Sequence, residues 1–178
     1  MITLTRITDI TSNEYRFTEE LLTTTFPREE YRDLGEQRKN TAGKQAFHLM
    51  VAHYGTKPIG FVSYWHLGDF CYVEHLATHP DIRGNGLGRA IVEELKKLAA
   101  KIVLEVEEPI DETTNRRINF YRRAGFEIST HPYMQPPYRK GDGTLPMRLM
   151  FYGLPADKEN FTKAQKVIYS NIYNYVEE

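Results

Sequence analysis

Apolar and polar residues alternate over several short stretches of the chain, which is typical of β-strands with one buried face. The alternation predicts strands at residues 2–8, 47–52, 59–65, 72–78, 102–106 and 145–151, and the start of another at 126–128. Turn residues at 55–58 and 68–69 separate the second, third and fourth of these strands. The second and third strands are therefore expected to form a hairpin.

Apolar residues recur at helical spacing between these strands, and capping residues precede several of the runs. The pattern predicts helices that begin near Ser12, Leu87, Asp111 and Asp157, the last with an apolar face that runs to Tyr175. A second polar helix with few apolar residues is expected at the surface over 29–39. A proline- and glycine-containing loop is expected at 131–142. The order of elements predicts one α/β domain over residues 1–178, with a central mixed β-sheet flanked by helices and an added C-terminal helix. The strand–helix–strand unit around residues 72–106 is expected to be parallel and right-handed.

Composition restricts the function classes. The 178 residues carry a net charge of −1, which indicates no general attraction to nucleic acid or to an anionic membrane. A single cysteine excludes an internal disulfide framework. The N-terminal residues lack a signal-peptide pattern, and no apolar run approaches membrane-spanning length. We therefore expect a soluble cytoplasmic protein that needs no metal.

A glycine-rich loop links the strand at 72–78 to the helix that begins near Leu87. Its sequence is Arg83-Gly84-Asn85-Gly86-Leu87-Gly88, and Arg89 follows. The glycines permit positive φ and let backbone N–H groups approach a ligand, and the helix adds the positive end of its dipole. This combination is typical of a phosphate site, although an ordinary tight turn would share the glycines. The loop matches neither the P-loop nor the dinucleotide fingerprint.

Two motifs together resemble a known family. Arg83-x-x-Gly86-x-Gly88, after a strand that ends in Leu76-Ala77-Thr78, resembles the acyl-CoA loop of the GCN5-related N-acetyltransferases (GNAT family). Downstream, Phe120-Tyr121-x-x-x-Gly125-Phe126 is similar to a second motif of that family. The resemblance is strongest over residues 45–130. It implies the acyl-CoA N-acyltransferase fold and acetyl-CoA as the acyl donor.

The resemblance also implies which residues bind the donor. The loop residues 83–89 would hold the diphosphate, mainly through backbone N–H groups. Backbone groups of residues 76–78 would bind the pantetheine arm, and an N–H near Leu76 would polarise the thioester carbonyl. Relatives commonly carry a CoA-contacting asparagine seven residues before the motif tyrosine. Here Thr114 occupies that position, and Asn115 is the candidate one place later.

Two carboxylates are candidates for the general base, Glu74 as the first choice and Glu105 as the second. Glu74 shares a strand face with Leu76 by alternation, and relatives often place a base at a similar position. Other relatives use a glutamate placed like Glu105 on the following strand. His75 points to the opposite face from Glu74, and His79 lies at the strand end, so both are weaker candidates. The lone Cys71 is more typical of inert packing than of an acyl carrier.

Tyr121 is the strongest catalytic candidate, because the family tyrosine lies near the sulfur and can protonate the departing thiolate. Packing on an apolar helix face is the alternative role. The sequence thus predicts an N-acetyltransferase that moves an acetyl group from acetyl-CoA to a primary amine of a small molecule or peptide, by direct attack in a ternary complex. A non-catalytic acyl-CoA-binding regulatory module is the alternative. A homodimer is possible through the tyrosine-rich C-terminal helix.

Overall fold

The computed structural model describes residues 1–176, which form two compact units. The first unit comprises residues 1–66 and 73–98, and the second comprises residues 67–72 and 99 onward. Each unit is described by itself below. The predicted single domain over residues 1–178 therefore stays a prediction.

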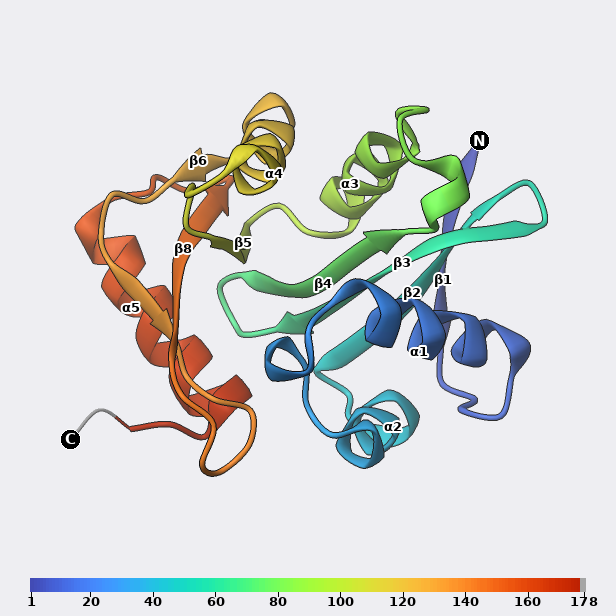
Figure 1. Ribbon diagram of the computed structural model, residues 1–178, viewed down its shortest axis with the longest axis horizontal. Coiled ribbons are helices and arrows are strands. Elements are labelled where there is room, and N and C mark those ends of the chain that lie inside the picture. The colour runs from blue at the N-terminus through green and yellow to red at the C-terminus, as the bar shows by residue number, and fades with distance from the viewer. Residues whose placement is uncertain (177–178) are drawn as a thin grey trace. The chain divides into compact units, whose positions relative to one another are not determined.

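The first unit contains four strands and three α-helices (Figure 1). Its elements in chain order are β1 (Ile2–Ile7), α1 (Asn13–Thr25), the 3-10 turn η1 (Arg28–Glu30), α2 (Leu34–Gly43), β2 (Phe47–Tyr54), β3 (Lys57–His66), β4 (Cys71–Thr78, in this unit from Val73), the 3-10 turn η2 (Pro80–Ile82) and α3 (Leu87–Leu98). The strands follow the order β1-β2-β3-β4.

The predicted hairpin is confirmed by antiparallel pairing of β2 with β3, in a register that places Phe47 opposite Trp65. β1 pairs antiparallel with β2 on its other side. β3 approaches β4 closely at Gly60, where an added Cβ would lie 2.4 Å from the Ala77 carbonyl oxygen. Gly60 is therefore required by close packing of the backbone at the strand end that leads to the glycine loop.

Helix α1 begins where the sequence predicts, because the Ser12 side chain caps it by accepting a hydrogen bond from the Tyr15 N–H at 3.1 Å. α3 buries Ile91, Val92 and Leu95 and packs against β1. Figure 1 shows α3 on one side of the strands of this unit and α1 and α2 on the other.

The predicted helix at 29–39 differs from the structure. Residues 28–30 form a 3-10 turn, and α2 starts only at Leu34. Most of residues 29–39 lie at the surface as expected, but Arg32 and Gln37 are buried. Polar side chains anchor this segment, so hydropathy periodicity gave no signal for it.

Up to residue 176, the second unit contains four strands and two α-helices. They are β5 (Ile102–Glu107), α4 (Glu112–Arg123), β6 (Glu127–Ile128), β7 (Tyr133–Gln135), β8 (Leu145–Tyr152), α5 (Lys158–Ile168) and a π-helical turn, η3 (Tyr169–Tyr173). β5, β6 and β7 all pair antiparallel with β8. β7 lies inside the segment predicted as a loop, and it is too short for alternation to be recognised.

Helix termini in the second unit agree with the capping signals. Asp111 and Thr114 form a reciprocal capping box at the start of α4. Gly125 follows the helix with φ +91°, a conformation that glycine adopts without strain. α5 begins after its cap Asp157 as predicted, but its α-helical geometry ends at Ile168 rather than continuing to Tyr175.

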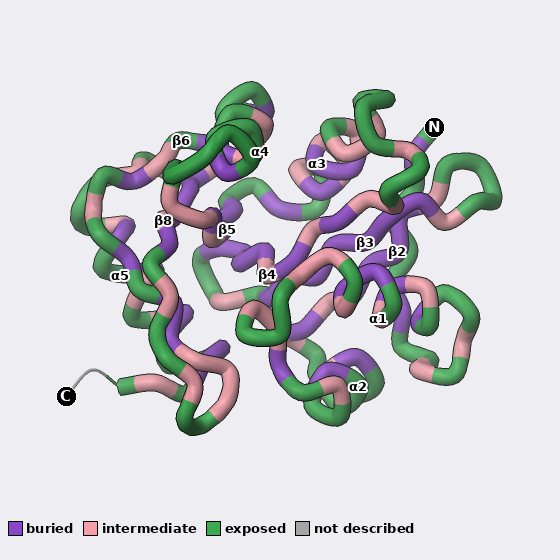
Figure 2. The backbone as a smooth tube through the Cα atoms, in the orientation of Figure 1, coloured by how far each residue is buried: buried purple, intermediate pink, exposed green. Residues whose placement is uncertain are grey.

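Burial follows the strands in both units (Figure 2). β3 is buried over seven consecutive residues from Ile59 to Trp65, as expected for a strand covered on both faces. In the second unit, Leu149 and Met150 of β8 are fully buried. The mixed α/β class that the sequence predicts is confirmed.

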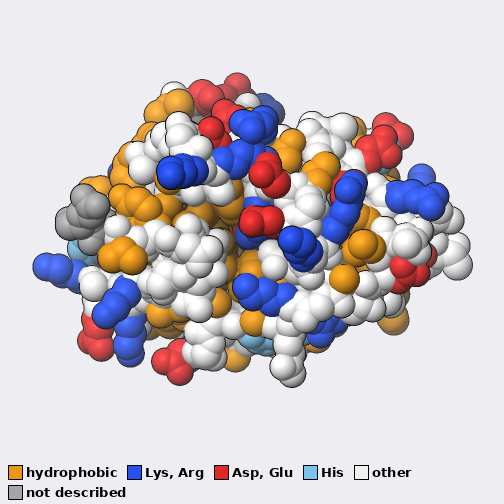
Figure 3. Space-filling view, turned by 90° about the horizontal axis from the view of Figure 1, so that it is seen from below, with side chains coloured by type: hydrophobic (Ala, Val, Ile, Leu, Met, Phe, Trp, Pro, Cys, Tyr) orange, Lys and Arg blue, Asp and Glu red, His pale blue; other side chains and the backbone are white. Residues whose placement is uncertain are grey.

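Within residues 1–176, no helix is long and apolar enough to cross a membrane. On the face drawn in Figure 3, cationic and anionic side chains are interspersed. This distribution agrees with the net charge of −1.

Candidate active site

The glycine loop has the backbone conformation that the sequence indicates. Gly84 and Gly86 adopt φ of +87° and +72°, and an added Cβ at either would meet no atom within 4 Å. Conformation, rather than space, therefore requires glycine at both positions. The first α-helical hydrogen bond runs from the Ala90 N–H to the Gly86 carbonyl at 3.1 Å. The N–H groups of residues 87–89 precede it and lie at the positive end of α3.

The two arginines of this segment lie at the surface. Arg89 forms an exposed ion pair with Glu93, with an N–O separation of 3.2 Å. Such a pair is weak and can exchange for a phosphate. Arg83 and Asn85 are exposed, and Leu87 and Gly88 form the first turn of α3. The loop therefore combines two exposed cations with two glycines in the left-handed conformation.

The preceding strand brings three candidate donor-binding residues to the end of β4. Leu76 and Thr78 are half-buried, while Ala77 between them is buried, as expected for alternation across a sheet. The His79 N–H donates to the Ile59 carbonyl at 2.8 Å, which fixes the exit from the strand. Residues 76–78 and the loop 83–89 thus belong to one compact unit.

Glu74 is held in a buried ion pair. Its carboxylate accepts hydrogen bonds from both terminal nitrogens of Arg32, and the Trp65 Nε1–H donates to the same group at 2.9 Å. The Glu74 side chain is fully shielded from solvent, and that of Arg32 is 5% exposed. The Arg32 guanidinium also lies over the Trp65 ring, 5.4 Å from its centroid. This bidentate geometry is the strongest form of a carboxylate–guanidinium contact.

This environment sets the protonation of Glu74. Burial alone would raise the pKa of its carboxyl, but the Arg32 charge and the hydrogen bonds from Arg32 and Trp65 outweigh burial and lower the pKa to about 2. Burial lowers the pKa of neighbouring His75, so this imidazole is neutral near pH 7 and we assign the lowering at Glu74 to Arg32 and Trp65. Glu74 is therefore ionised but weakly basic.

His75, His79 and Cys71 are in contacts that suit packing rather than catalysis. His75 is buried, and its Nε2 lies 2.8 Å from the Glu30 carbonyl oxygen. His79 stacks on Phe17, with ring centroids 6.3 Å apart. Burial raises the pKa of the Cys71 thiol, which keeps it neutral. A neutral buried thiol is a poor nucleophile, in agreement with the packing role expected for Cys71.

In the second unit, Glu105 of β5 is bound by two tyrosines. The Tyr133 hydroxyl donates to one carboxylate oxygen, and the Tyr173 hydroxyl lies 3.1 and 2.9 Å from the two oxygens. Burial and the Glu105 charge raise the pKa of both phenols well above the usual range, so both remain donors. Counted as whole residues, Glu105 and Glu74 are both half-buried.

Tyr121 lies in α4 of the second unit and is 8% exposed. Its ring makes edge contacts with Phe120 and Phe126, at centroid distances of 5.0 and 5.4 Å. Burial raises the pKa of its phenol to about 12. Tyr121 is therefore protonated at neutral pH and is packed by the two phenylalanines of its own motif.

Thr114 and Asn115, the two residues near the start of α4 considered for CoA contact, make different hydrogen bonds. Thr114 is buried in the capping box with Asp111, so its hydroxyl is committed to the helix terminus. Asn115 is exposed, and its amide donates to the Asp111 carbonyl at 2.7 Å. Of the two, only Asn115 presents its side chain at the surface.

The structure thus groups the sequence-predicted residues in two sets. Residues 74–78 and 83–89 lie in the first unit, and Glu105, Asn115 and Tyr121 lie in the second. Sequence reasoning did not find Arg32 or Trp65 around Glu74, nor Tyr133 or Tyr173 around Glu105. These partners are 9 to 68 residues distant along the chain, where no local pattern records a contact. Among residues 1–176, no three His, Cys, Asp or Glu side chains are grouped to hold a metal ion.

Comparison with known proteins places the chain in a family. Residues 45–128 match the model of the acetyltransferase (GNAT) domain. A solved GNAT-family structure from Bacteroides thetaiotaomicron is 41% identical with a TM-score of 0.91, and the alignment covers 98% of this chain and 99% of that one. The Bacillus subtilis (strain 168) protein YjbC, whose name describes it as an acetyltransferase, is 31% identical over 113 residues. That match spans 61% of this chain and 58% of YjbC.

A more distant structure shares the fold. A GNAT-family acetyltransferase from Elizabethkingia anophelis, solved with acetyl-CoA bound, is 18% identical with a TM-score of 0.57, covering 86% of this chain and 98% of that one. The fold, the family-domain match and the full-length relative agree. The chain belongs to the GNAT acetyltransferase family and has its mixed α/β acyl-CoA N-acyltransferase fold.

The Glu74 environment predicts a specific acid sensitivity. The carboxyl pKa is about 2 in the folded protein against an ordinary value of 4.5, so its contribution to stability is present above pH 4.5 and is lost as the pH falls toward 2. The full contribution is on the order of 3 kcal/mol. In urea unfolding, wild type should lose about 2 kcal/mol more than Glu74→Gln between pH 6 and pH 3.

A matched control is Glu108→Gln, because Glu108 also binds an arginine, Arg148, but with both side chains 27% exposed. This variant should keep the pH dependence of wild type, since exposed pairs contribute little. Equal pH dependence in wild type and Glu74→Gln would show that the buried pair does not control acid stability.

Proposed function

We propose that this protein is an N-acetyltransferase that transfers the acetyl group of acetyl-CoA to a primary amine of a small molecule or peptide, by direct attack in a ternary complex. The observation that carries the proposal is the loop before α3, where two left-handed glycines precede a helix terminus in a chain of the GNAT family. The acetyl-CoA bound to the Elizabethkingia anophelis relative supports the choice of donor.

The loop supplies the donor site in this proposal. Backbone N–H groups of residues 84–89 hold the diphosphate, assisted by the dipole of α3. Arg83 and Arg89 add positive charge, since both are exposed and Arg89 can leave its surface ion pair. Residues 76–78 bind the pantetheine arm by backbone contacts, and the N–H of Leu76 polarises the thioester carbonyl. Asn115 contributes a further polar contact to CoA.

We assign the general base to Glu105 ahead of Glu74. A catalytic base is most effective when its pKa lies near the working pH. Glu74 has a carboxyl pKa of about 2, and its shielded oxygens are bound by Arg32 and Trp65. The phenols of Tyr133 and Tyr173, which stay protonated at neutral pH, donate to the Glu105 carboxylate and orient it. Glu105 takes the amine proton, directly or through water, and Glu74 stabilises the strand that carries the donor-binding backbone.

Tyr121 acts on the leaving group. A phenol with a pKa of about 12 keeps its proton at neutral pH. Complete transfer to a thiolate, whose conjugate acid has a pKa of about 8.5, is uphill. We therefore assign Tyr121 a hydrogen bond to the departing sulfur, which stabilises the negative charge that develops there.

The reaction balances with these roles. The amine nitrogen forms a bond to the thioester carbon, and the carbon–sulfur bond breaks with its electron pair on sulfur. Glu105 accepts the proton released by nitrogen, and the thiolate leaves with a hydrogen bond from Tyr121. No covalent acyl-enzyme is needed, in keeping with the neutral, buried thiol of Cys71.

Donor binding is tested with Gly86→Glu in isothermal titration with acetyl-CoA. The new side chain adds negative charge at the diphosphate and strains a residue with φ of +72°. Loss of two charge-assisted hydrogen bonds, about 1.5 kcal/mol each, should weaken binding by about 100-fold. Gly55→Glu is the matched control, because Gly55 is also left-handed with open space around it, and its affinity should stay unchanged. Retained affinity in Gly86→Glu would refute the phosphate role.

The Tyr121 role is tested by the variant Tyr121→Phe in a thiol-release assay with an amine panel. Removing the hydroxyl should lower kcat by about 100-fold while leaving the acetyl-CoA Kd near that of wild type. Tyr15→Phe, at another buried tyrosine, should keep the wild-type kcat. Unchanged turnover in Tyr121→Phe would reduce this residue to packing, and donor binding without turnover on any amine would favour a non-catalytic binding module.

The base assignment is tested by comparing Glu105→Gln with Glu74→Gln. Glu105→Gln should lower kcat by at least about 100-fold and remove the acidic limb of the pH–rate profile. Glu74→Gln, assayed at neutral pH well below its unfolding temperature, should retain more activity and keep that limb. The reverse ranking, with folded Glu74→Gln inactive and Glu105→Gln active, would return the base role to Glu74.

A further inference from the structure

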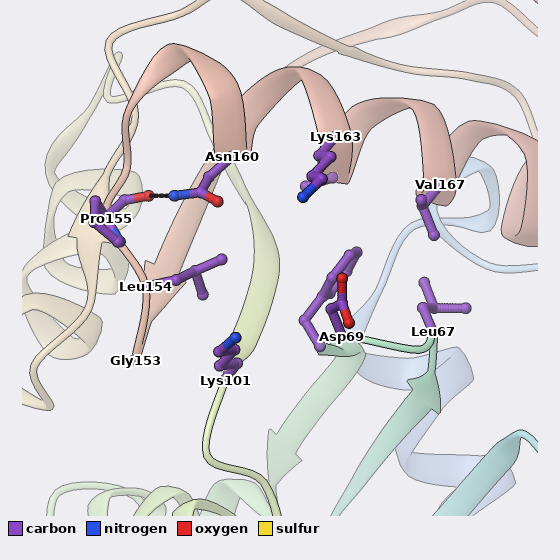
Figure 4. A pocket seen from close by; sticks show the side chains of 11 residues that line it. Leu67, Asp69, Lys101, Gly153, Leu154, Pro155, Asn160, Lys163 and Val167 are labelled. Carbon is purple, nitrogen blue, oxygen red and sulfur yellow. Dashed lines mark hydrogen bonds between the residues drawn. The ribbon is translucent and has the colours of Figure 1, made fainter.

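A cavity of about 370 Å³ lies within the second unit, between α5 and the turn that follows β3 (Figure 4). Its walls come from the 67–70 turn, Lys101 before β5, the 153–155 segment after β8 and one face of α5. None of these residues is a candidate for donor binding or catalysis. The volume falls in the range of sites that enclose a small organic molecule.

The cavity walls are mainly apolar. Phe70 and Ala164 are buried, while Leu67, Leu154 and Val167 are half-buried. Half-buried aliphatic side chains that surround a hollow gain free energy when a ligand covers them. The cavity is therefore suited to an apolar group.

The backbone around the cavity is fixed. Gly153 has φ of +78°, and an added Cβ there would lie 1.9 Å from the Ala100 carbonyl oxygen. The Cys71 N–H donates to the Lys101 carbonyl, and the Leu67 N–H donates to the Phe70 carbonyl, both at 2.9 Å. These contacts hold the floor and the turn, so the cavity is largely formed before a ligand enters.

Polar groups converge on the same space. Figure 4 shows the Lys101 and Lys163 side chains extending toward the cavity from opposite walls, with Asp69 on the turn that faces α5. The Asn160 amide donates to the Pro155 carbonyl at 3.0 Å, which directs its carbonyl oxygen inward. Among residues 1–176, Lys101, Lys163 and Asp69 are in no ion pair within 4.0 Å.

We infer that this cavity binds a free apolar α-amino acid in its zwitterionic form. The two lysine ammonium groups match the α-carboxylate, and Asp69 with the Asn160 oxygen matches the α-ammonium. Phe70, Leu154 and Val167 cover the apolar side chain. A carboxylate without an ammonium would leave Asp69 facing an anion, and an amine without a carboxylate would face two lysines.

The inference is tested by titrating the protein, without acetyl-CoA, with L-phenylalanine and two fragments that each lack one charge, 3-phenylpropionate and 2-phenylethylamine. L-Phenylalanine should bind at least about tenfold more tightly than either fragment, equivalent to about 1.4 kcal/mol. Equal affinities for all three, or no saturable binding of L-phenylalanine, would overturn the inference.

Variants of residues that line the cavity test whether L-phenylalanine binds there. Lys163→Met and Val167→Trp, which remove a cation and fill the space, should each weaken L-phenylalanine binding by at least about tenfold. Lys166→Met removes an exposed cation of the same helix outside the cavity and should bind as wild type does. Wild-type affinity in both cavity variants would place the amino acid elsewhere.

The test is independent of the proposed acetyl transfer. Gly86→Glu, which changes the donor loop, should bind L-phenylalanine with wild-type affinity, so failure of the donor site and failure of this cavity give different results. Parallel loss of amino-acid binding in Gly86→Glu would indicate binding at the acetyl-transfer site and would overturn the assignment.

Discussion

A buried ion pair between Arg32 and Glu74 holds together distant parts of the first unit. It joins the segment between η1 and α2 to β4, 42 residues away along the chain, and Trp65 of β3 completes it. Ions taken out of water must be matched fully, because loss of one partner leaves an uncompensated buried charge. The strand that leads to the glycine loop is therefore tied to the polar segment that hydropathy alone would have left at the surface.

The contacts of Glu74 also distinguish it from Glu105, which the sequence alone could not do. Glu74 and Glu105 occupy similar positions on neighbouring strands in the chain order, and either could serve as a base by resemblance. Their partners differ. A guanidinium and an indole stabilise the charged form of Glu74, whereas two phenols orient the carboxylate of Glu105.

Local signals in the sequence predicted most of the fold and the backbone conformation of the glycine loop. Ser12, Asp111 and Asp157 cap their helices, and Gly84 and Gly86 adopt the left-handed conformation that their position suggested. The sequence did not predict β7, which is three residues long, or the start of α2, whose buried residues are polar. It also could not predict the ion pair at Glu74 or the phenols at Glu105, since these depend on long-range folding.

Tyr173 belongs to the π-helical turn η3, far outside the residues that match the family domain, yet it donates to Glu105 of β5. The hydrogen bonding of a carboxylate on β5 therefore depends on a segment near the C-terminus. A deletion library or a domain swap limited to the family-matched residues 45–128 would remove this phenol and also that of Tyr133, so that Glu105 would lose both tyrosine donors. The boundaries chosen for such chimaeras therefore decide which groups donate hydrogen bonds to the candidate base Glu105.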